Sequence, residues 1–300
     1  MEIMQLKYFY TLAQVQHMTK AAKELHIAQP ALSRTLRNLE SELNLQLFDR
    51  AGKHIYLNEN GKALLRHVKI ILQELEDAER ELKELKGRTD RYVSLSLHAG
   101  SSLLPEMIGG FKNKHPEIVL QIIQQDSPGT TREKCDISIY SSIEPAGSEN
   151  STVLMEEEIR IAMPLSNPLS ASDSIRLTDT ANEPFICLFK GAGLRVVTDE
   201  YCKMAGFSPN IVLESDSPAT VRELISLGVG LSFIPMISWP NVAKDPSVKL
   251  VKITEPYCKR YVNMRWRASC YVPKASILLR EYLIDFFENV SRQYELKEEE

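Results

Sequence analysis

The spacing of apolar residues between positions 6 and 61 constrains the fold of this chain more than any other feature. In three successive segments the apolar side chains recur three or four residues apart, which predicts short helices that each bury one face. A tight turn separates the second segment from the third, and Pro30 stands near the start of the third, where a missing N–H costs little. Two short helices joined in this way, the second with a polar outer face, predict a helix-turn-helix. The apolar positions are Leu6, Phe9, Leu12, Ala13, Ala21, Ala22, Leu25, Ala31, Leu32, Leu36, Leu39 and Leu43.

The polar side chains of this region are suited to contacts with DNA. Gln29 can pair bidentately with adenine, and Pro30 offers a flat apolar contact to a thymine methyl group. Ser33 is small enough to let the helix approach the bases, whereas Arg34 can reach either a guanine or a phosphate. Thr19 offers an oxygen to the free amides at the start of the second helix. The predicted DNA-contacting residues are Thr19, Gln29, Pro30, Ser33, Arg34, Arg37, Arg50 and Lys53, of which Arg37 and Arg50 neutralise backbone charge.

Local charge favours DNA binding over the alternative, a helical core whose polar face is merely solvated. Residues 1–70 hold ten Lys or Arg and six Asp or Glu, a net charge of +4; the whole chain carries −4, so the remainder carries −8. A basic segment on an acidic body is the asymmetry expected of a module that binds a polyanion. Residues 48–57 place Arg50, Lys53 and His54 around Gly52, which predicts a two-stranded wing lying along the phosphates.

At these positions the chain resembles the LysR-type transcriptional regulators. Many residues match in order and spacing within roughly 60 positions, which is more specific than one short motif. Ala28 stands where that family commonly has a capping Ser, and Asn58 where Thr is usual, although Asn can also cap a helix. The matching runs are Met18-Thr19-Lys20-Ala21-Ala22, Leu25, Ala28-Gln29-Pro30-Ala31-Leu32-Ser33-Arg34, Leu39-Glu40, Leu47-Phe48-Asp49-Arg50 and Leu57-Asn58-Glu59-Asn60-Gly61.

A narrow apolar seam runs through residues 59–87 and predicts a long helix that needs a partner. Its apolar residues are spaced alternately four and three apart, and its exterior is almost wholly charged, as in a coiled coil. We expect Asn58 to cap the helix and Gly87 to end it. The alternative is that the seam packs against the chain's own body; the resemblance implies instead a linker helix that pairs two DNA-binding segments. The seam contains Ala78, Leu85 and the predicted dimerisation residues Leu64, Val68, Ile71, Leu75 and Leu82.

Residues 92–300 alternate between strand-like and helix-like segments, which predicts α/β units around a largely parallel sheet. About 200 residues exceed one typical domain of this kind, so we expect two lobes. Predicted strands cover residues 92–97, 118–123, 135–140, 159–163, 185–189, 211–214 and 231–234, and a strand-like run at 261–272 returns the chain to the first lobe. Predicted helices cover residues 103–114, 195–205, 219–227 and 276–292.

The predicted fold class is thus α/β with an all-α N-terminal part. The resemblance implies a winged helix-turn-helix, a long linker helix and a two-lobed effector-binding domain similar to periplasmic solute-binding proteins. The run Gly228-Val229-Gly230-Leu231-Ser232-Phe233-Ile234-Pro235 resembles the family's second-lobe turn and strand. The predicted division is 1–58 for the DNA-binding domain, 59–87 for the linker helix, 92–163 with 267–300 for lobe I and 164–266 for lobe II.

Ligands of such sheets collect where strand ends meet helix N-termini, because the free amides there favour anions. Three places fit this rule: Gly100-Ser101-Ser102, Ser127, and Phe189-Lys190-Gly191-Ala192-Gly193. We expect a small organic acid or an amino-acid-like metabolite, with Lys190 as a counter-charge; the alternative is that Ser and Gly at strand ends only form turns. The predicted effector-binding residues are Ser101, Ser102, Ser127, Tyr140, Phe189 and Lys190.

The sequence contains no sign of a metal centre or a redox cofactor. The five cysteines show no CxxC and no Cys/His pairing at metal spacing, and the six histidines form no metal constellation. Cys202, which follows a polar run, is the cysteine least easily dismissed as a buried small hydrophobe, and a redox switch there is the minor alternative. The cysteines are Cys135, Cys187, Cys202, Cys258 and Cys270.

Three classes of function were weighed against these patterns. An enzyme is disfavoured because no GxSxG elbow, P-loop, HExxH or dinucleotide fingerprint occurs. A solute-binding protein is disfavoured by the basic N-terminal segment and by the lack of a secretory signal, and no stretch is apolar enough to span a bilayer. We therefore expect a cytoplasmic, homo-oligomeric transcription regulator. Its expected partners are double-stranded operator DNA, a second copy of itself, a small-molecule effector and RNA polymerase, with no membrane.

Overall fold

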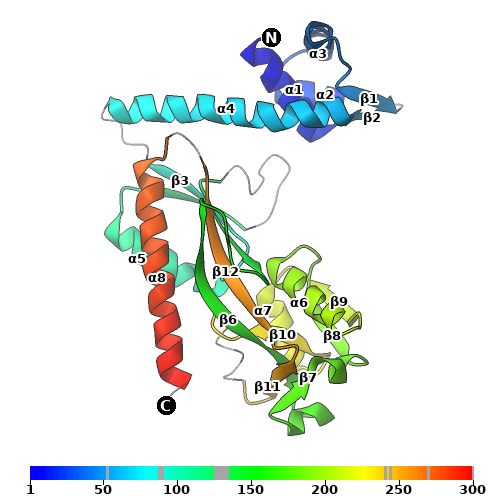
Figure 1. The fold of residues 1–300 in the computed structure, drawn as a ribbon, viewed down its shortest axis with the longest axis vertical. Helices are drawn as coiled ribbons and strands as arrows, with labels where there is room; N and C mark the ends of the chain where they lie inside the picture. The colour runs from blue at the N-terminus through cyan, green and yellow to red at the C-terminus, as the bar shows by residue number, and fades with distance from the viewer. Residues whose placement is uncertain are drawn as a thin grey trace. The chain divides into compact units, whose positions relative to one another are not determined.

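The computed structural model describes residues 1–51, 54–86, 91–124, 135–239, 242, 245–268 and 271–298. The chain divides into two compact units (Figure 1). The first unit holds the N-terminal helices, the wing and the long helix, and the second unit holds the α/β body. In the described parts of the chain, no helix combines the length and the apolar content that crossing a bilayer requires.

The first unit is a winged helix-turn-helix followed by a long helix, as predicted. Its apolar core is built from the residues that the helical spacing selected, among them Phe9, Leu12, Leu32 and Leu39, none of which is exposed. The two wing strands pair antiparallel, with Phe48 opposite Leu57. The elements are α1 (Ile3–Val15), α2 (Met18–Glu24), α3 (Gln29–Leu43), β1 (Phe48–Ala51), β2 (His54–Leu57) and α4 (Glu59–Leu85).

Two local predictions for the helix-turn-helix were wrong. Helix α2 begins at Met18 and is capped by His17, whose Nδ1 accepts a hydrogen bond from the Lys20 amide, so Thr19 lies inside the first turn and is not its cap. Ala31 was expected on the inner face of α3 but is exposed, because the buried stripe consists of Leu32, Leu36 and Leu39. Helix α3 starts at Gln29, and its N-cap residue Ala28 makes no side-chain cap bond because a methyl group cannot accept one.

Helices α1 to α3 and the wing, residues 3–57, form the head of the first unit. Helix α4 is anchored to the head at its first turn. The side chain of Asn58 accepts a hydrogen bond from the Gly61 amide at 2.9 Å, which confirms the predicted cap. A Cβ atom at Gly61 would overlap the carbonyl oxygen of Leu47, so only glycine permits this close approach. Val68, two turns further on, is fully buried in the core of the head. The predicted helix end at Gly87 lies outside the described residues.

The second unit contains one large mixed sheet, one small sheet and the helices that cover them. The large sheet has the order β4-β3-β5-β12-β6-β11-β7, with β10 also paired to β6, and the small sheet pairs β8 with β9. The strands are β3 (Tyr92–Leu97), β4 (Val119–Ile123), β5 (Ile137–Ser142), β6 (Ser151–Pro164), β7 (Ser174–Arg176), β8 (Pro184–Leu188), β9 (Asn210–Ser215), β10 (Ser232–Pro235), β11 (Val248–Glu255) and β12 (Lys259–Trp266). The helices are η1 (Ser101–Leu103), α5 (Leu104–Lys114), η3 (Pro168–Ala171), η4 (Leu177–Thr180), α6 (Gly193–Met204), α7 (Pro218–Ser226) and α8 (Lys274–Glu298).

The expectation of a largely parallel sheet holds only away from the middle of the unit. Strand β3 pairs parallel with β4 and β5, and β8 pairs parallel with β9. The long strands β6 and β12 pair antiparallel with each other, and β12 is also antiparallel to β5. The prediction missed β7 and β11, and it found only the second half of β6, because residues 151–158 do not alternate polar and apolar side chains.

Two separate apolar cores define two lobes. The lobe I core includes Leu95, Phe111 and Leu279, and the lobe II core includes Phe185, Val197 and Ile225. Both cores draw residues from β6, with Leu154 and Met155 in lobe I and Ile159, Ile161, Ala162 and Met163 in lobe II. Where the chain returns to lobe I, Cys258 still belongs to the lobe II core and Val262 belongs to the lobe I core. The cores thus favour lobe boundaries several residues earlier than the predicted ones, since β6 and β12 run through both lobes (Figure 1).

Two glycines near residue 230 lie in the turn between α7 and β10. Gly228 ends the turn after α7 with a φ of +76°, which other residues rarely adopt. A Cβ atom at Gly230 would lie 2.6 Å from the carbonyl oxygen of Pro184. These glycines let the end of α7 pack closely on the strands of lobe II.

Candidate functional site

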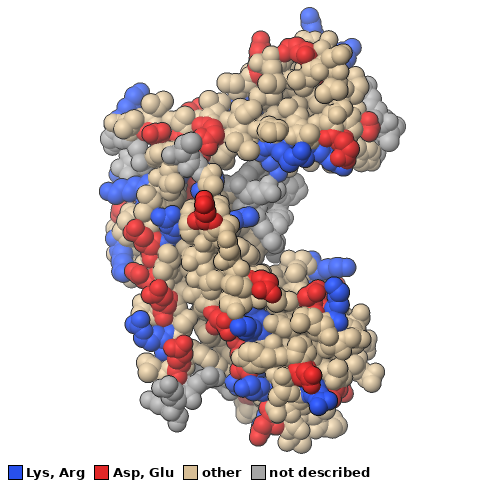
Figure 2. Space-filling model, in the orientation of Figure 1, with Lys and Arg blue, Asp and Glu red and all other residues tan. Residues whose placement is uncertain are grey.

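The predicted DNA-contacting side chains of α2 and α3 lie on one polar, accessible part of the head. Thr19, Gln29, Pro30, Arg34 and Arg37 are exposed, and Ser33 is half-buried between them. Arg37 donates from Nε to the Ser33 carbonyl oxygen at 3.3 Å, which leaves its terminal nitrogens for other acceptors. The side chain of Arg50 and all of Lys53 lie outside the described residues. On the face of the second unit drawn in Figure 2, Lys and Arg are interspersed with Asp and Glu, so that face offers no purely basic surface to a polyanion.

The apolar seam of α4 is divided into a part that packs within the head and a part that is exposed. Val68 is fully buried and Leu64 partly buried in the head core, so for these two the alternative of packing on the chain's own body applies. Leu75 is half-buried, whereas Ile71, Leu82 and Leu85 are exposed. Leu82 and Leu85 have 59% and 77% of their surface accessible, too much for apolar side chains to be accounted for by the head. The prediction that Val68 packs against a second copy is therefore corrected: Val68 packs within its own chain.

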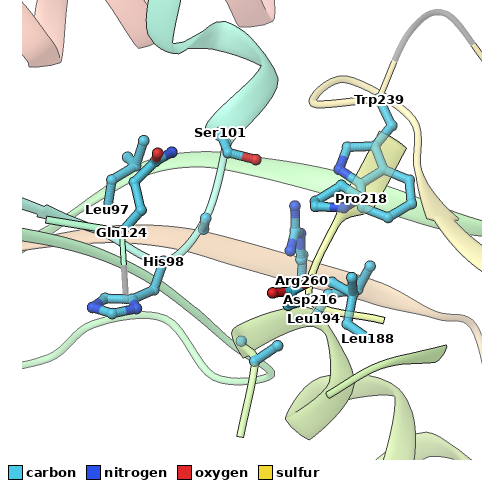
Figure 3. Close-up of a pocket in the computed structure, with 14 residues that line it drawn as sticks. Leu97, His98, Ser101, Gln124, Leu188, Leu194, Asp216, Pro218, Trp239 and Arg260 are labelled. Carbon is cyan, nitrogen blue, oxygen red and sulfur yellow. The ribbon is translucent and has the colours of Figure 1, made fainter. Parts of the chain in front are cut away.

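A cavity of about 260 Å³ lies between the two lobes of the second unit (Figure 3). The segment after β3 supplies one wall, and the starts of α6 and α7 supply the opposite wall. One part of its lining is apolar: Leu97, Ala99, Leu188, Ala192, Leu194, Pro218 and Trp239. The other part can make hydrogen bonds or carries charge: His98, Ser101, Gln124, Asp216 and Arg260. A largely apolar cavity with a few polar groups in its wall is the usual form of a site for a small metabolite.

Several polar groups of the cavity lack partners within the described protein. The side chains of Ser101, Gln124 and Asp216 make no hydrogen bond or ion pair with another described residue. Helix α6 begins at Gly193 after Ala192, whose side chain cannot cap it, so its first amides are free to meet a ligand. His98 differs, because its Nε2 lies 2.6 Å from the hydroxyl oxygen of Ser96. The cavity therefore presents donors and a carboxylate that have no partner among the described residues.

Arg260 is held in the cavity wall by a buried network on the strands that both lobes share. Its Nε donates to Oε1 of Glu157 and its Nη2 to Oγ of Ser238, both at 2.8 Å. The side chains of Arg260 and Glu157 are 3% and 0% exposed. Glu157 also accepts bonds from the amides of Ile237 and Ser238. The remaining terminal nitrogen, Nη1, has among the described residues only a 3.5 Å contact to Oγ of Ser141, so that edge of the guanidinium is available to a ligand.

The first turn of α6 is fixed in position from both of its sides. Arg195 is buried and donates to Asp199, Glu214 and the Leu188 carbonyl oxygen at 2.6, 2.7 and 3.0 Å. Burial lowers the pKa of Arg195, but the hydrogen bonds that it donates to Glu214 and Asp199 raise that pKa by more, so the guanidinium stays charged. On the other side, a Cβ atom at Gly193 would lie 2.6 Å from Oγ of Ser141 in lobe I. Glycine thus permits the close contact of α6 with lobe I beside the cavity.

Of the predicted effector-binding residues, Ser101 lines the cavity. Ser102 is exposed and donates its hydroxyl to the Ser238 carbonyl oxygen, and Tyr140 is half-buried on β5. Phe189 and Lys190 are exposed in the turn after β8, because α6 starts two residues before the predicted Arg195 and the residues that face the cavity are Ala192 to Leu194. The prediction that these four residues line the effector site is corrected, because none of them is among the residues that line the cavity. Ser127 lies outside the described residues.

The sequence reasoning missed most of the polar lining. Asp216 and Pro218 follow β9 and begin α7, so the strand-end rule applied to this third α/β unit would have found them. Gln124 directly follows β4 and would have been found in the same way. Arg260 and Trp239 gave no such signal, because they reach the cavity only through the long-range pairing of β12 and β10 with β6.

The described cysteines are buried and unreactive in character. Cys135, Cys187, Cys202 and Cys258 are free and buried. Burial raises the pKa of Cys187 to about 11 and that of both Cys202 and Cys258 to about 12, which keeps the thiols protonated at neutral pH. Cys270 lies outside the described residues. Within the described parts of the chain, no group of His, Cys, Asp and Glu side chains is arranged to hold a metal ion.

A winged helix-turn-helix joined by a long helix to a two-lobed α/β domain with a cavity between its lobes defines a DNA-binding regulator with a substrate-binding domain. Residues 3–62 match the family described as "Bacterial regulatory helix-turn-helix protein, lysR family", and residues 92–288 match "LysR substrate binding domain". The chain belongs to the LysR family of bacterial transcriptional regulators, a family of regulators rather than enzymes.

Known relatives agree with this membership over nearly the whole chain. The transcriptional regulator YybE of Bacillus subtilis (strain 168), itself uncharacterized, is 34% identical over 293 residues, which are 96% of this chain and 99% of YybE. The crystal structure of full-length CbnR complexed with its target DNA is similar with a TM-score of 0.58 and 21% identity, covering 94% of this chain and 99% of CbnR. The effector-binding domain of QuiR in complex with shikimate has a TM-score of 0.54 and 24% identity, covering 66% of this chain and 97% of that domain. These likenesses establish the fold.

Proposed function

We propose that this protein binds operator DNA as a homo-oligomer in the cytoplasm and changes its DNA contacts when a small organic metabolite enters the cavity between its lobes. The observation that carries this proposal is a single chain that joins an exposed polar recognition helix to a cavity of about 260 Å³ whose polar groups include several without a partner among the described residues. A ligand can shift the equilibrium between two lobe arrangements only if it binds one of them better. A cavity with walls from both lobes meets that condition.

Self-association through α4 is supported by its exposed apolar residues. Ile71, Leu82 and Leu85 lie exposed on the seam after the part that the head covers. A stripe of this kind is buried most simply by the same stripe of a second copy. Two copies joined in this way would present two recognition helices to the two half-sites of an operator.

Within the head, we assign base reading to Gln29 and Pro30 and phosphate contacts to Arg37, Arg50 and Lys53. The assignment of Gln29 is supported by its exposed position at the first turn of α3, because the first residues of a recognition helix are those that reach base edges. Thr19, Ser33 and Arg34 complete the proposed DNA-contacting set. RNA polymerase is the further partner that a transcription regulator implies.

The test is a selection of bound duplexes from fragmented genomic DNA with the full-length protein, followed by footprinting with and without a panel of metabolites. We expect a recurrent two-fold related site whose footprint changes with at least one small organic acid or amino acid. Binding that shows no sequence preference, or a footprint that no metabolite alters, would contradict the DNA-reading or the effector half of the proposal respectively.

Variants separate the roles of the contacting residues. Gln29→Ala should lose discrimination at one base position, whereas Arg50→Ala should weaken binding to all sequences alike and reduce the salt slope by about one. Gln14→Ala on α1, also an exposed glutamine, serves as the matched control. An equal loss of affinity for cognate and random DNA in Gln29→Ala would contradict its role.

A further inference from the structure

The cavity between the lobes holds two opposite charges at defined places, and these charges specify the ligand further. Among the described lining residues, Arg260 is the only guanidinium or ammonium group and Asp216 the only carboxylate. They come from different elements, Arg260 from β12 and Asp216 from the turn between β9 and α7. The two side chains form no ion pair with each other, so each remains able to pair with a ligand.

The groups around Arg260 form a subsite for a carboxylate. The Nη1 edge of its guanidinium is the one that Glu157 and Ser238 leave open. Figure 3 shows the guanidinium of Arg260 and the hydroxyl of Ser101 directed toward the space that Trp239 and Pro218 border. The uncapped first turn of α6 adds free amides from Gly193 onward. Because Glu157 already neutralises the charge of Arg260, this subsite offers a carboxylate hydrogen-bond donors rather than net positive charge, and it does not suit a more highly charged anion.

Asp216 requires a different partner from the same ligand. Its carboxylate lines the cavity and has no hydrogen-bond donor among the described residues. An anion alone would leave this carboxylate beside a like charge, whereas a cation alone would leave the Nη1 edge of Arg260 with only its 3.5 Å hydrogen bond to Ser141. Arg260 is buried and Asp216 is exposed to the solvent of the cavity, so a ligand that fills the cavity covers the Asp216 carboxylate, and covering it without a partner is unfavourable. A ligand with an ammonium and a carboxylate satisfies both.

The rest of the lining describes the body of the ligand. Leu188, Leu194, Pro218 and Trp239 give one side of the cavity an apolar surface. The volume of about 260 Å³ is just below the range in which drug-sized ligands bind, so the ligand is a small metabolite. A further charged group, on the side chain of the ligand, would face these apolar residues without compensation.

We propose that the effector is a zwitterionic amino acid with an uncharged, largely apolar side chain, bound through its carboxylate by Arg260 and Ser101 and through its ammonium by Asp216. This proposal rests on the proposed function, because it takes the cavity between the lobes to be the effector site. It narrows the organic acids and amino-acid-like metabolites considered above to one charge pattern.

The experiment measures binding to the full-length protein by the fluorescence of Trp239. The chain has two tryptophans, Trp239 and Trp266, so a Trp266→Phe background leaves the cavity tryptophan as the sole one. Titrations use free L-alanine, L-valine, L-leucine, L-methionine and L-phenylalanine. For the amino acid that binds most tightly, two further probes are its analogue without the ammonium (4-methylpentanoate for leucine) and its analogue without the carboxylate (3-methylbutylamine). Calorimetry on the unmodified protein checks each affinity.

We expect at least one amino acid to bind, and each analogue that lacks one charge to bind at least about tenfold more weakly. In Asp216→Asn, the advantage of the amino acid over its ammonium-free analogue should fall to about threefold or less, because the partner of the ammonium is no longer charged. Asp285→Asn on α8, an exposed aspartate away from the cavity, is the matched control and should keep the full preference. An unchanged preference in Asp216→Asn overturns the proposal.

A wider metabolite panel separates failure of this proposal from failure of the proposed function. If a dicarboxylate or a neutral hydroxy acid alters Trp239 fluorescence and the footprint on DNA while no amino acid does, the ligand class is wrong and the effector-responsive function stands. If no compound alters either signal, the cavity is not an effector site, and both proposals are overturned.

Discussion

Removing the carboxylate of Glu157 should destabilise the second unit strongly. Glu157 is fully buried and accepts hydrogen bonds at 2.7 to 3.1 Å from Arg260, from the hydroxyl and amide of Ser238, and from the amide of Ile237. In Glu157→Ala, the guanidinium of Arg260 stays buried without its counter-charge, and the two amides lose their acceptor. Breaking a buried ion pair by deleting one partner costs about 3–5 kcal/mol. We expect the loss in unfolding free energy to lie in this range.

Urea denaturation of the full-length protein measures this loss. Both tryptophans, Trp239 and Trp266, belong to the second unit, so their fluorescence follows the unfolding of that unit alone. The adjacent Glu156→Ala is the matched control, because Glu156 is exposed and pairs with Lys259 at the surface, where ion pairs contribute little. With Arg260→Met, the double variant should be less destabilised than the sum of the single variants. Equal losses in Glu157→Ala and Glu156→Ala, or strictly additive effects, would refute the reasoning.

Three further predictions concern the head, the long helix and the cysteines. Gly61→Ala should destabilise the head by about 1–3 kcal/mol, because the added Cβ atom overlaps the Leu47 carbonyl oxygen. The measurement is faster amide hydrogen exchange in α1 and α3. The control Gly109→Ala, which has open space around its Cβ position, should not destabilise its helix. Leu82→Lys should weaken dimerisation at least about tenfold in sedimentation equilibrium, because a charge replaces a seam residue; an unchanged dimer would place the interface elsewhere. Burial raises the pKa of Cys202 to about 12, so this thiol should resist iodoacetamide at pH 8 in the native protein and react in urea. Peptide mass spectrometry measures the labelling, and labelling of the native protein would show that the thiol is accessible.

The head was predictable because its structure follows from contacts between residues close in sequence. The three-and-four spacing that places Leu32, Leu36 and Leu39 on one face of α3 also determines which side chains, such as Gln29 and Arg34, remain outside. The error in the cap of α2 was also local: His17, two residues before Thr19, caps the helix in its place.

The cavity was less predictable because its parts are brought together by strand pairings that span much of the chain. The strand-end rule found Ser101, and it would have found Asp216, since both lie between a strand and the following helix. Arg260 and Glu157 are 103 residues apart and meet only because β12 and β6 pair in one register, with Arg260 opposite Glu157. A single-residue shift of that register would turn Arg260 away from the cavity, and no local pattern encodes the register.

The position of the cavity residues determines which ligands can act as signals. Ser101 belongs to lobe I, Asp216 and the first turn of α6 belong to lobe II, and Arg260 lies on a strand that both lobes share. A ligand changes the balance between lobe arrangements only through contacts that differ between them. A small anion that contacts Arg260 alone would bind nearly equally in each arrangement and leave the balance unchanged. A ligand that spans Ser101 and Asp216 must hold the two lobes at one separation, so the same charge pattern that selects a ligand also makes that ligand able to signal.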